Sequence, residues 1–66
     1  MRMWSSRELL KVLHQDGWYI KRQRGSHLQL IHSAKPGKVT VPHPRKNLDH
    51  KTVRSILRQA GIKGDK

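Results

Sequence analysis

The chain contains no cysteine, few acidic residues and no long apolar segment. Without cysteine it forms neither disulfide bonds nor thiolate metal sites, so its stability must come from the packing of helices on a small sheet. No segment approaches the roughly 20 apolar residues that span a bilayer, and residues 1–7 lack the apolar run of a signal peptide. We therefore expect a soluble cytoplasmic protein that does not span a membrane.

Positive charge dominates the composition. Fifteen Lys and Arg residues oppose four Asp and Glu residues, and the formal net charge is +11. This excess predicts a polyanionic partner, and nucleic acid is favoured because the chain lacks the basic amphipathic helix with bulky apolar residues that an anionic membrane would attract. An acidic protein partner is compatible with the same charge. The length of 66 residues predicts a single domain, residues 1–66.

The N-terminal part has the pattern of an amphipathic helix. Ser5 and Glu8 fit a capping box, in which each side chain accepts a hydrogen bond from the other residue's backbone N–H. Leucines recur after it at helical spacing, and Asp16-Gly17 ends the pattern with a glycine suited to the left-handed position after a helix. The pattern predicts a helix over residues 6–15.

The C-terminal part predicts a second helix. Asp49 is suited to the cap position, and apolar residues follow at spacings of i, i+3, i+4 and i+7 up to Gly61. The tail, residues 63–66, has nothing to bury and is expected to fray. Between the second helix and the strands, residues 42–47 are too rich in proline for a helix and predict an extended basic connection.

Alternation of apolar and polar residues predicts three short strands, at residues 18–23, 26–32 and 39–41. A two-residue loop at 24–25 would split the apolar faces of the first two strands, so we expect a three-residue loop, 23–25, with Gly25 in a left-handed conformation. In the expected register Ile20 pairs with Leu28, Trp18 with Leu30, Tyr19 with Gln29 and Lys21 with His27, while the third strand places Thr40 beside Gln29 and Pro42 beside His27.

The element order is therefore α-β-β-β-α, an α+β fold. Each helix has one apolar stripe and the antiparallel sheet has one apolar face, so both helices are expected on the same side of the sheet. The other face stays open to solvent, where its polar groups are available to a ligand. His27, at the start of the second strand, is expected on this open face.

Four segments together resemble one protein family, the HicA-type toxins of bacterial and archaeal toxin-antitoxin pairs. They are Asp16-Gly17-Trp18-Tyr19, Gly25-Ser26-His27 with Gln29, residues 39–44 and residues 52–61. The resemblance implies a double-stranded-RNA-binding-like fold, an mRNA-cleaving endoribonuclease that needs no metal or other cofactor, and a HicB-type antitoxin partner. It also implies that His27 is the active-site histidine. The chain departs from the family pattern at Leu28 and Ser33.

Metal-free RNA cleavage needs a base for the 2′-hydroxyl proton, a proton donor for the leaving 5′-oxygen and positive charge near the phosphate. An imidazole exchanges a proton near neutral pH, so His27 is the candidate general acid or base. Lys21, expected opposite it, is the candidate phosphate contact. The candidate RNA-binding residues are Lys21, Arg22, Arg24, Ser26, Gln29, Lys38, Arg45 and Lys46.

Each of these assignments has an ordinary structural alternative. The basic residues also suit a solvated surface, and Ser26 suits a turn. Tyr19 could stack on a base or pack across the strands. The other four histidines lack helical i, i+4 spacing and accompanying carboxylates, so no metal site is expected.

Three functions are compatible with these features. The first is the toxin ribonuclease. The second is a non-catalytic module that binds double-stranded RNA, because such domains share the α-β-β-β-α order. The third is a basic protein whose only ligand is an acidic partner, and RNA degradation by the purified chain would distinguish it from the first.

Overall fold

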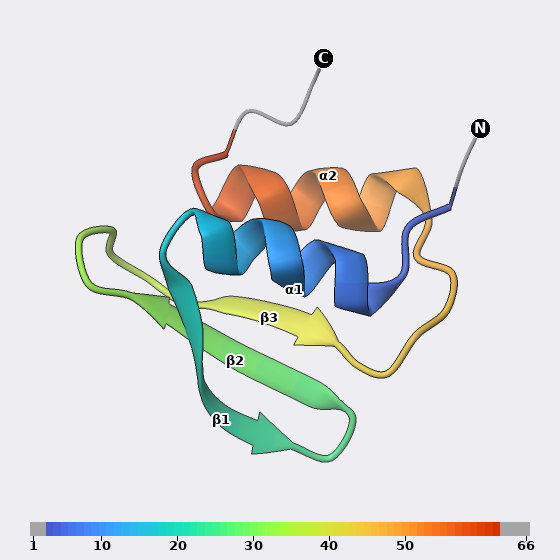
Figure 1. Cartoon of the computed structure of the whole chain (residues 1–66), viewed down its shortest axis with the longest axis horizontal. Coiled ribbons are helices and arrows are strands. Elements are labelled where there is room, and N and C mark those ends of the chain that lie inside the picture. Colours follow the sequence, from blue (N-terminus) through green and yellow to red (C-terminus); the bar gives the residue numbers. More distant parts are fainter. Residues whose placement is uncertain (1–2, 63–66) are drawn as a thin grey trace.

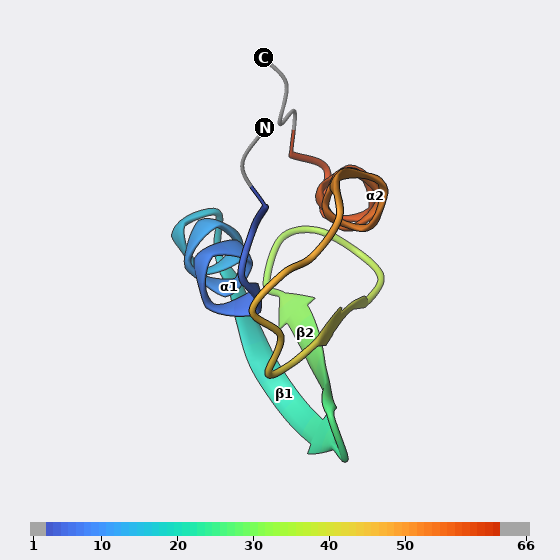
Figure 2. The same ribbon diagram turned by 90° about the vertical axis from the view of Figure 1, so that its right-hand side faces the viewer.

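The structure is a computed structural model, and it describes residues 3–62. The elements are α1 (Ser6–Gln15), β1 (Trp18–Arg24), β2 (His27–His32), β3 (Val39–Pro42) and α2 (His50–Gln59). The strands form one antiparallel sheet in the order β1-β2-β3. Both helices lie on the same side of it, as Figures 1 and 2 show. The predicted order and layering are confirmed, whereas the predicted fraying of residues 63–66 lies outside the described residues.

Both helices begin at the residues that their capping patterns predict. The Ser5 hydroxyl accepts a hydrogen bond from the Glu8 N–H at 3.1 Å, and the Glu8 carboxylate accepts one from the Ser5 N–H at 3.0 Å. At α2, the Asp49 carboxylate accepts a hydrogen bond from the Thr52 N–H at 2.8 Å. Neither helix of the described chain is long and apolar enough to cross a membrane.

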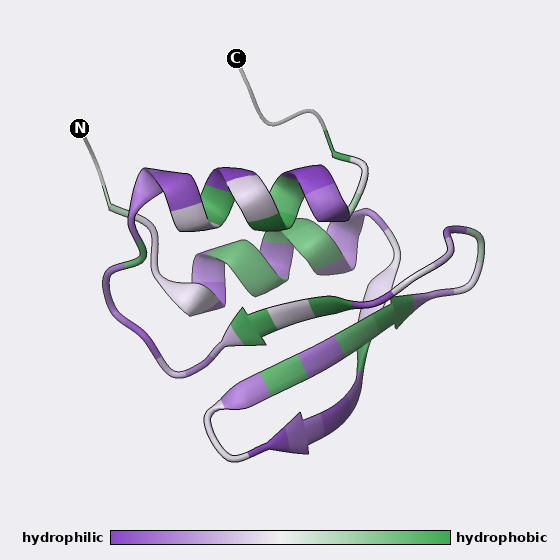
Figure 3. Cartoon of the chain, turned by 180° about the vertical axis from the view of Figure 1, so that it is seen from behind, coloured by the Kyte–Doolittle hydropathy of each residue, from purple (hydrophilic) through white to green (hydrophobic). Residues whose placement is uncertain are grey.

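The core lies between the two helices and the covered face of the sheet. Leu9 and Leu13 of α1 meet Trp18, which is 1% exposed and donates its indole N–H to the Ala60 carbonyl at 3.3 Å. Hydrophobic and hydrophilic residues alternate along β2 in Figure 3, and its two leucines, Leu28 and Leu30, are buried in the core. The buried apolar residues are Leu9, Leu13, Trp18, Leu28, Leu30, Val39, Val41, Leu48, Val53, Ile56, Leu57 and Ala60.

The register of β2 with β3 is the predicted one. His27 lies opposite Pro42, and Gln29 lies opposite Thr40. Because residues directly opposite one another share a face, the burial of Val39 and Val41 places Thr40 on the open face together with Gln29 and His27. The alternation within β2 therefore fixes the face on which His27 lies.

The predicted register of β1 with β2 is wrong. Arg24 lies opposite His27, so the loop has two residues, and Gly25 is the first of them with φ +56. The extra residue that keeps the apolar faces together is instead absorbed within β1, where the pairing shifts between Ile20 and Arg22. Lys21 occupies this irregularity and does not face His27. The full set of observed pairs is Trp18 with His32, Tyr19 with Ile31, Ile20 with Leu30, Arg22 with Gln29, Gln23 with Leu28 and Arg24 with His27.

The corner between α1 and β1 is built around the His32 ring. Its Nδ1 accepts hydrogen bonds from the backbone N–H groups of Ala34 and Lys35 at 2.9 and 3.1 Å. Because Nδ1 is an acceptor, the ring proton is on Nε2, which donates to the Asp16 carbonyl at 2.7 Å. The same ring meets Trp18 edge-on, with centroids 5.2 Å apart. His32 thus joins the end of α1 to the loop after β2.

The segment before α1 is joined to the connection between β3 and α2. Trp4 and Leu48 exchange two backbone hydrogen bonds, and the Ser6 N–H donates to the Arg45 carbonyl at 2.9 Å. The buried Ser6 hydroxyl accepts from the Arg45 N–H at 3.0 Å and lies 2.7 Å from His43 Nδ1. These contacts fix the predicted extended connection against the helix layer.

Candidate functional site

His27 lies at the first position of β2, immediately after the Gly25-Ser26 turn, and its side chain is exposed. Arg24 of β1 and Pro42 of β3 are its cross-strand neighbours on the open face. The backbone on its N-terminal side is also held, because the Ser26 carbonyl accepts a hydrogen bond from the His43 N–H at 2.8 Å. The imidazole therefore projects into solvent from a fixed backbone, between the strand positions of Arg24 and Pro42.

A second row of polar residues lies next to His27 on the open face. Arg22, Gln29 and Thr40 are directly opposite one another across the three strands. Two of the predicted RNA-binding arginines, Arg22 and Arg24, thus lie on the same face as His27, and Arg24 takes the place that the sequence assigned to Lys21.

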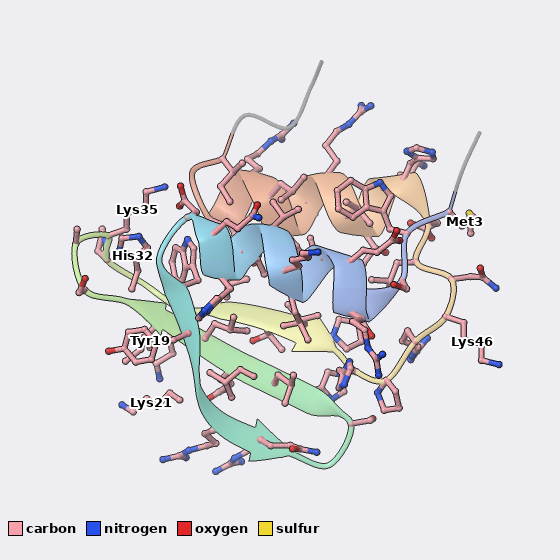
Figure 4. The ribbon with its side chains drawn as sticks, viewed as in Figure 1. Met3, Tyr19, Lys21, His32, Lys35 and Lys46 are labelled. Atoms are coloured by element: carbon pink, nitrogen blue, oxygen red, sulfur yellow. The ribbon has the colours of Figure 1, made fainter. Side chains whose placement is uncertain are left out.

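The other predicted basic residues are more dispersed. Lys21 and Lys46 project from different sides of the molecule in Figure 4, Lys21 from β1 and Lys46 from the connection after β3. Arg45 lies on the same connection, where its backbone is bound to Ser6. Lys38 precedes β3 and lies with His27 in the groove described next. Ser26 is a turn residue, in keeping with its ordinary structural alternative.

An open groove of about 500 Å³ extends from His27 along β3, the edge strand of the sheet, and α2 borders its other side. The sheet contributes His27, Lys38, Thr40 and Pro42, and the helix contributes Lys51, Thr52, Ser55, Ile56 and Gln59. Sequence reasoning missed the helical wall. The sequence does hold a signal for this wall, because the polar α2 residues that line the groove border the apolar stripe of the helix at helical spacing. The sequence alone does not show that this border faces β3.

The carboxylates of the described residues are all engaged in contacts with other residues, and none of them lines the groove. Asp16 accepts a hydrogen bond from the Lys35 ammonium at 2.6 Å, which holds the pKa of its carboxyl below the ordinary value. Hydrogen bonds from Thr52 likewise lower the pKa of Asp49, and Glu8 belongs to the capping box of α1. No acidic residue is among those that line the groove. The groove therefore presents positive charge and neutral hydrogen-bonding groups to a ligand.

The arrangement suits a phosphate ester better than a metal ion. Within residues 3–62 no three His, Cys, Asp or Glu side chains come together as a metal site. His27 instead offers an imidazole on the strand position opposite Arg24, and guanidinium groups bind phosphate oxygens through paired N–H donors.

Comparison with known proteins places the chain in a family. The model of the HicA toxin of bacterial toxin-antitoxin systems matches residues 6–62, which include every element of the fold. The chain belongs to the HicA toxin family. Among curated proteins none matches the chain.

Two solved structures are similar to this HicA family member. A chain of a toxin-antitoxin complex from Streptococcus pneumoniae is 30% identical, with a TM-score of 0.74, and the match covers 88% of this chain and 97% of that one. A chain of the HicA3 and HicB3 toxin-antitoxin complex is 35% identical, with a TM-score of 0.75, and the match covers 94% of this chain and 100% of that one. The α-β-β-β-α fold is thus that of the HicA toxins, as the resemblance implied.

Proposed function

We propose that this HicA toxin is a metal-independent endoribonuclease that cleaves mRNA, with His27 as its general acid or base. The observation that carries the proposal is the position of His27, exposed on the open face beside Arg24 and at the end of a groove without acidic residues. RNA supplies its own nucleophile, so a site of this kind needs proton transfer and charge stabilisation but no metal.

In the proposed reaction the 2′-oxygen attacks the phosphorus of the adjacent 3′-phosphodiester while the bond from phosphorus to the 5′-oxygen breaks. The 2′-hydroxyl loses a proton and the leaving 5′-oxygen gains one. His27 serves one of these two transfers. Arg24 and Arg22, which share its face, bind the phosphate oxygens, whose negative charge grows in the transition state. The products are a 2′,3′-cyclic phosphate and a 5′-hydroxyl.

The test uses an RNA oligonucleotide, the purified chain and EDTA. Mass spectrometry of the products should find cyclic phosphate ends, and a single 2′-deoxy nucleotide at the mapped scissile position should block cleavage there. Products with 5′-phosphate ends, or cleavage next to the 2′-deoxy nucleotide, would refute this chemistry.

A non-catalytic double-stranded-RNA-binding module is the alternative, and the element order α-β-β-β-α is the observation that favours it. It predicts that the chain binds an RNA duplex equally well with and without His27 and leaves every RNA intact. Cleavage by the wild-type chain in EDTA excludes this alternative.

We also propose a HicB-type antitoxin as the protein partner, because both similar chains come from toxin-antitoxin complexes. The simplest inhibitory arrangement covers His27. Coexpressed antitoxin should then protect His27 from modification by diethylpyrocarbonate, while the exposed His14 of α1 stays reactive. Unchanged reactivity of His27 in the complex would place the antitoxin elsewhere.

A further inference from the structure

The helical wall of the groove differs in chemistry from the rest of the basic surface. Ser55 and Gln59 of α2 line the groove and are exposed, one helical turn apart on the same side of the helix. Both side chains are uncharged, and each can donate and accept hydrogen bonds. Thr52 also lines this wall, but it is engaged with the Asp49 cap. Ser55 and Gln59 are therefore the wall's available neutral hydrogen-bonding groups.

The two walls run in opposite directions, because α2 is antiparallel to β3 in Figure 1. The N-terminal end of α2, with Lys51, lies toward Pro42 and hence toward His27, while Gln59 lies toward the start of β3 and Lys38. The groove thus has a cation near each end and neutral hydrogen-bonding groups between them. Ile56 and Pro42 add apolar surface to its lining.

The form of an RNA decides which of its chemical groups can reach the groove. The groove, of about 500 Å³, is within the size range of small-ligand sites, so it receives only a short piece of an RNA. An RNA duplex would meet the groove only with its backbone, because its bases are stacked inside. An unpaired strand can instead turn its base edges toward a protein, and sequence-specific RNA recognition relies on such strands.

We propose that α2 reads the bases of a single RNA strand in this groove and that Ser55 and Gln59 are the residues that determine sequence preference. The inference rests on the proposed function in taking RNA as the ligand. Phosphates contact Lys38 and Lys51 at the two ends, and base edges contact Ser55 and Gln59 between them, while the strand leads to His27.

The chain offers a matched control on the same helix. Arg54 and Arg58 are exposed residues of α2 that do not line the groove. Replacing them by alanine removes two positive charges, whereas replacing Ser55 and Gln59 removes none. All four positions are on the helix surface, and alanine favours helix, so neither double variant should unfold the chain.

The experiment measures binding by fluorescence anisotropy at fixed salt, in a His27→Ala background that does not cleave. The probes are fluorescein-labelled decamers of adenosine, cytidine and uridine and a ten-base-pair RNA duplex. We expect the preferred single strand to bind about tenfold more tightly than the duplex, which is the effect of one base contact worth about 1.4 kcal/mol. Ser55→Ala with Gln59→Ala should shrink the ratio between the tightest and weakest decamers about tenfold, which lies within the range of about 5- to 150-fold by which one base-reading contact discriminates.

Arg54→Ala with Arg58→Ala should weaken binding to all three decamers by a common factor and preserve their ratios, because phosphate attraction does not depend on sequence. The inference is overturned if the duplex binds as tightly as the best decamer, if the Ser55 and Gln59 substitutions leave the ratios unchanged, or if the arginine substitutions alter the ratios equally.

Cleavage by the wild-type chain is assayed in parallel, which separates the two proposals. Altered binding ratios without wild-type cleavage would uphold the inference and refute the nuclease. Cleavage by the wild type with unaltered binding ratios would support the nuclease and overturn the inference.

Discussion

Replacement of Gly17 by alanine tests how the corner between α1 and β1 is held. Gly17 has φ +108, and a Cβ added to it would lie 2.6 Å from His32 Nε2, closer than real Cβ atoms approach. Gly25 is the matched control, because it also has a positive φ, +56, but a Cβ added there would have no atom within 4 Å. Both substitutions strain the backbone, and only the first displaces a ring.

The expected magnitudes differ accordingly. Positive φ costs an alanine about 1–2 kcal/mol at Gly25, whose φ lies in the left-handed α region, and at least as much at Gly17, whose φ lies beyond that region. At Gly17 the displaced His32 ring would also weaken its three hydrogen bonds, to Asp16, Ala34 and Lys35. At about 1 kcal/mol each, loss of two of them brings the total to about 3–4 kcal/mol. A chain of this length has only about 3–10 kcal/mol of stability in all.

Urea unfolding followed by tryptophan fluorescence, to which the buried Trp18 and the half-buried Trp4 contribute, measures the difference. Gly17→Ala should lower the free energy of unfolding by at least about 2 kcal/mol more than Gly25→Ala does. In the His32→Ala background, where the ring is absent, the difference between the two glycine substitutions should shrink by about 2 kcal/mol. Equal costs in the wild-type background would refute the role given to the His32 ring.

Three further predictions follow from the contacts of individual side chains. The hydrogen bond from Lys35 lowers the pKa of the Asp16 carboxyl in the folded state from the ordinary value of 3.8. The contribution of this hydrogen bond to stability is therefore present above pH 3.8 and is lost on further acidification. Acid titration of wild type and Asp16→Asn, followed by circular dichroism, should show a steeper loss of stability for the wild type below about pH 4, and parallel curves would contradict the pairing. Arg24→Ala should slow RNA cleavage at least about tenfold while Lys21→Ala has a smaller effect, because Arg24 is the cross-strand neighbour of His27; the reverse order in single-turnover rates would favour the register expected from the sequence. Leu13→Ala, at a fully buried position, should cost about 2–5 kcal/mol in urea unfolding, and a cost below about 1 kcal/mol would contradict the described core.

The helices could be predicted from the sequence because their signals are local. Ser5 with Glu8, and Asp49 with the apolar positions after it, define where α1 and α2 begin without reference to the rest of the fold. The face of His27 was predictable for a similar reason, since alternation within β2 alone decides it.

The partner of His27 on β1 was not predictable in the same way. The apolar pattern correctly requires one extra residue between the two strands, but it does not say where the residue is inserted. In the structure the extra residue is Lys21 of β1, and the turn has two residues with glycine at the first position. The wall formed by α2 escaped prediction because it depends on how the helix lies over β3, a tertiary feature that periodicity does not encode.

The central claim is that His27 transfers a proton during RNA cleavage. Its most direct test is the single-turnover rate of cleavage of one defined RNA, in EDTA, by the wild type, His27→Ala and His14→Ala. His14 is exposed on α1 and is outside the residues that line the groove, so it controls for the loss of an imidazole. We predict a fall of about 10²–10⁴-fold for His27→Ala and no change for His14→Ala. A His27→Ala chain that folds and cleaves at the wild-type rate would contradict the account.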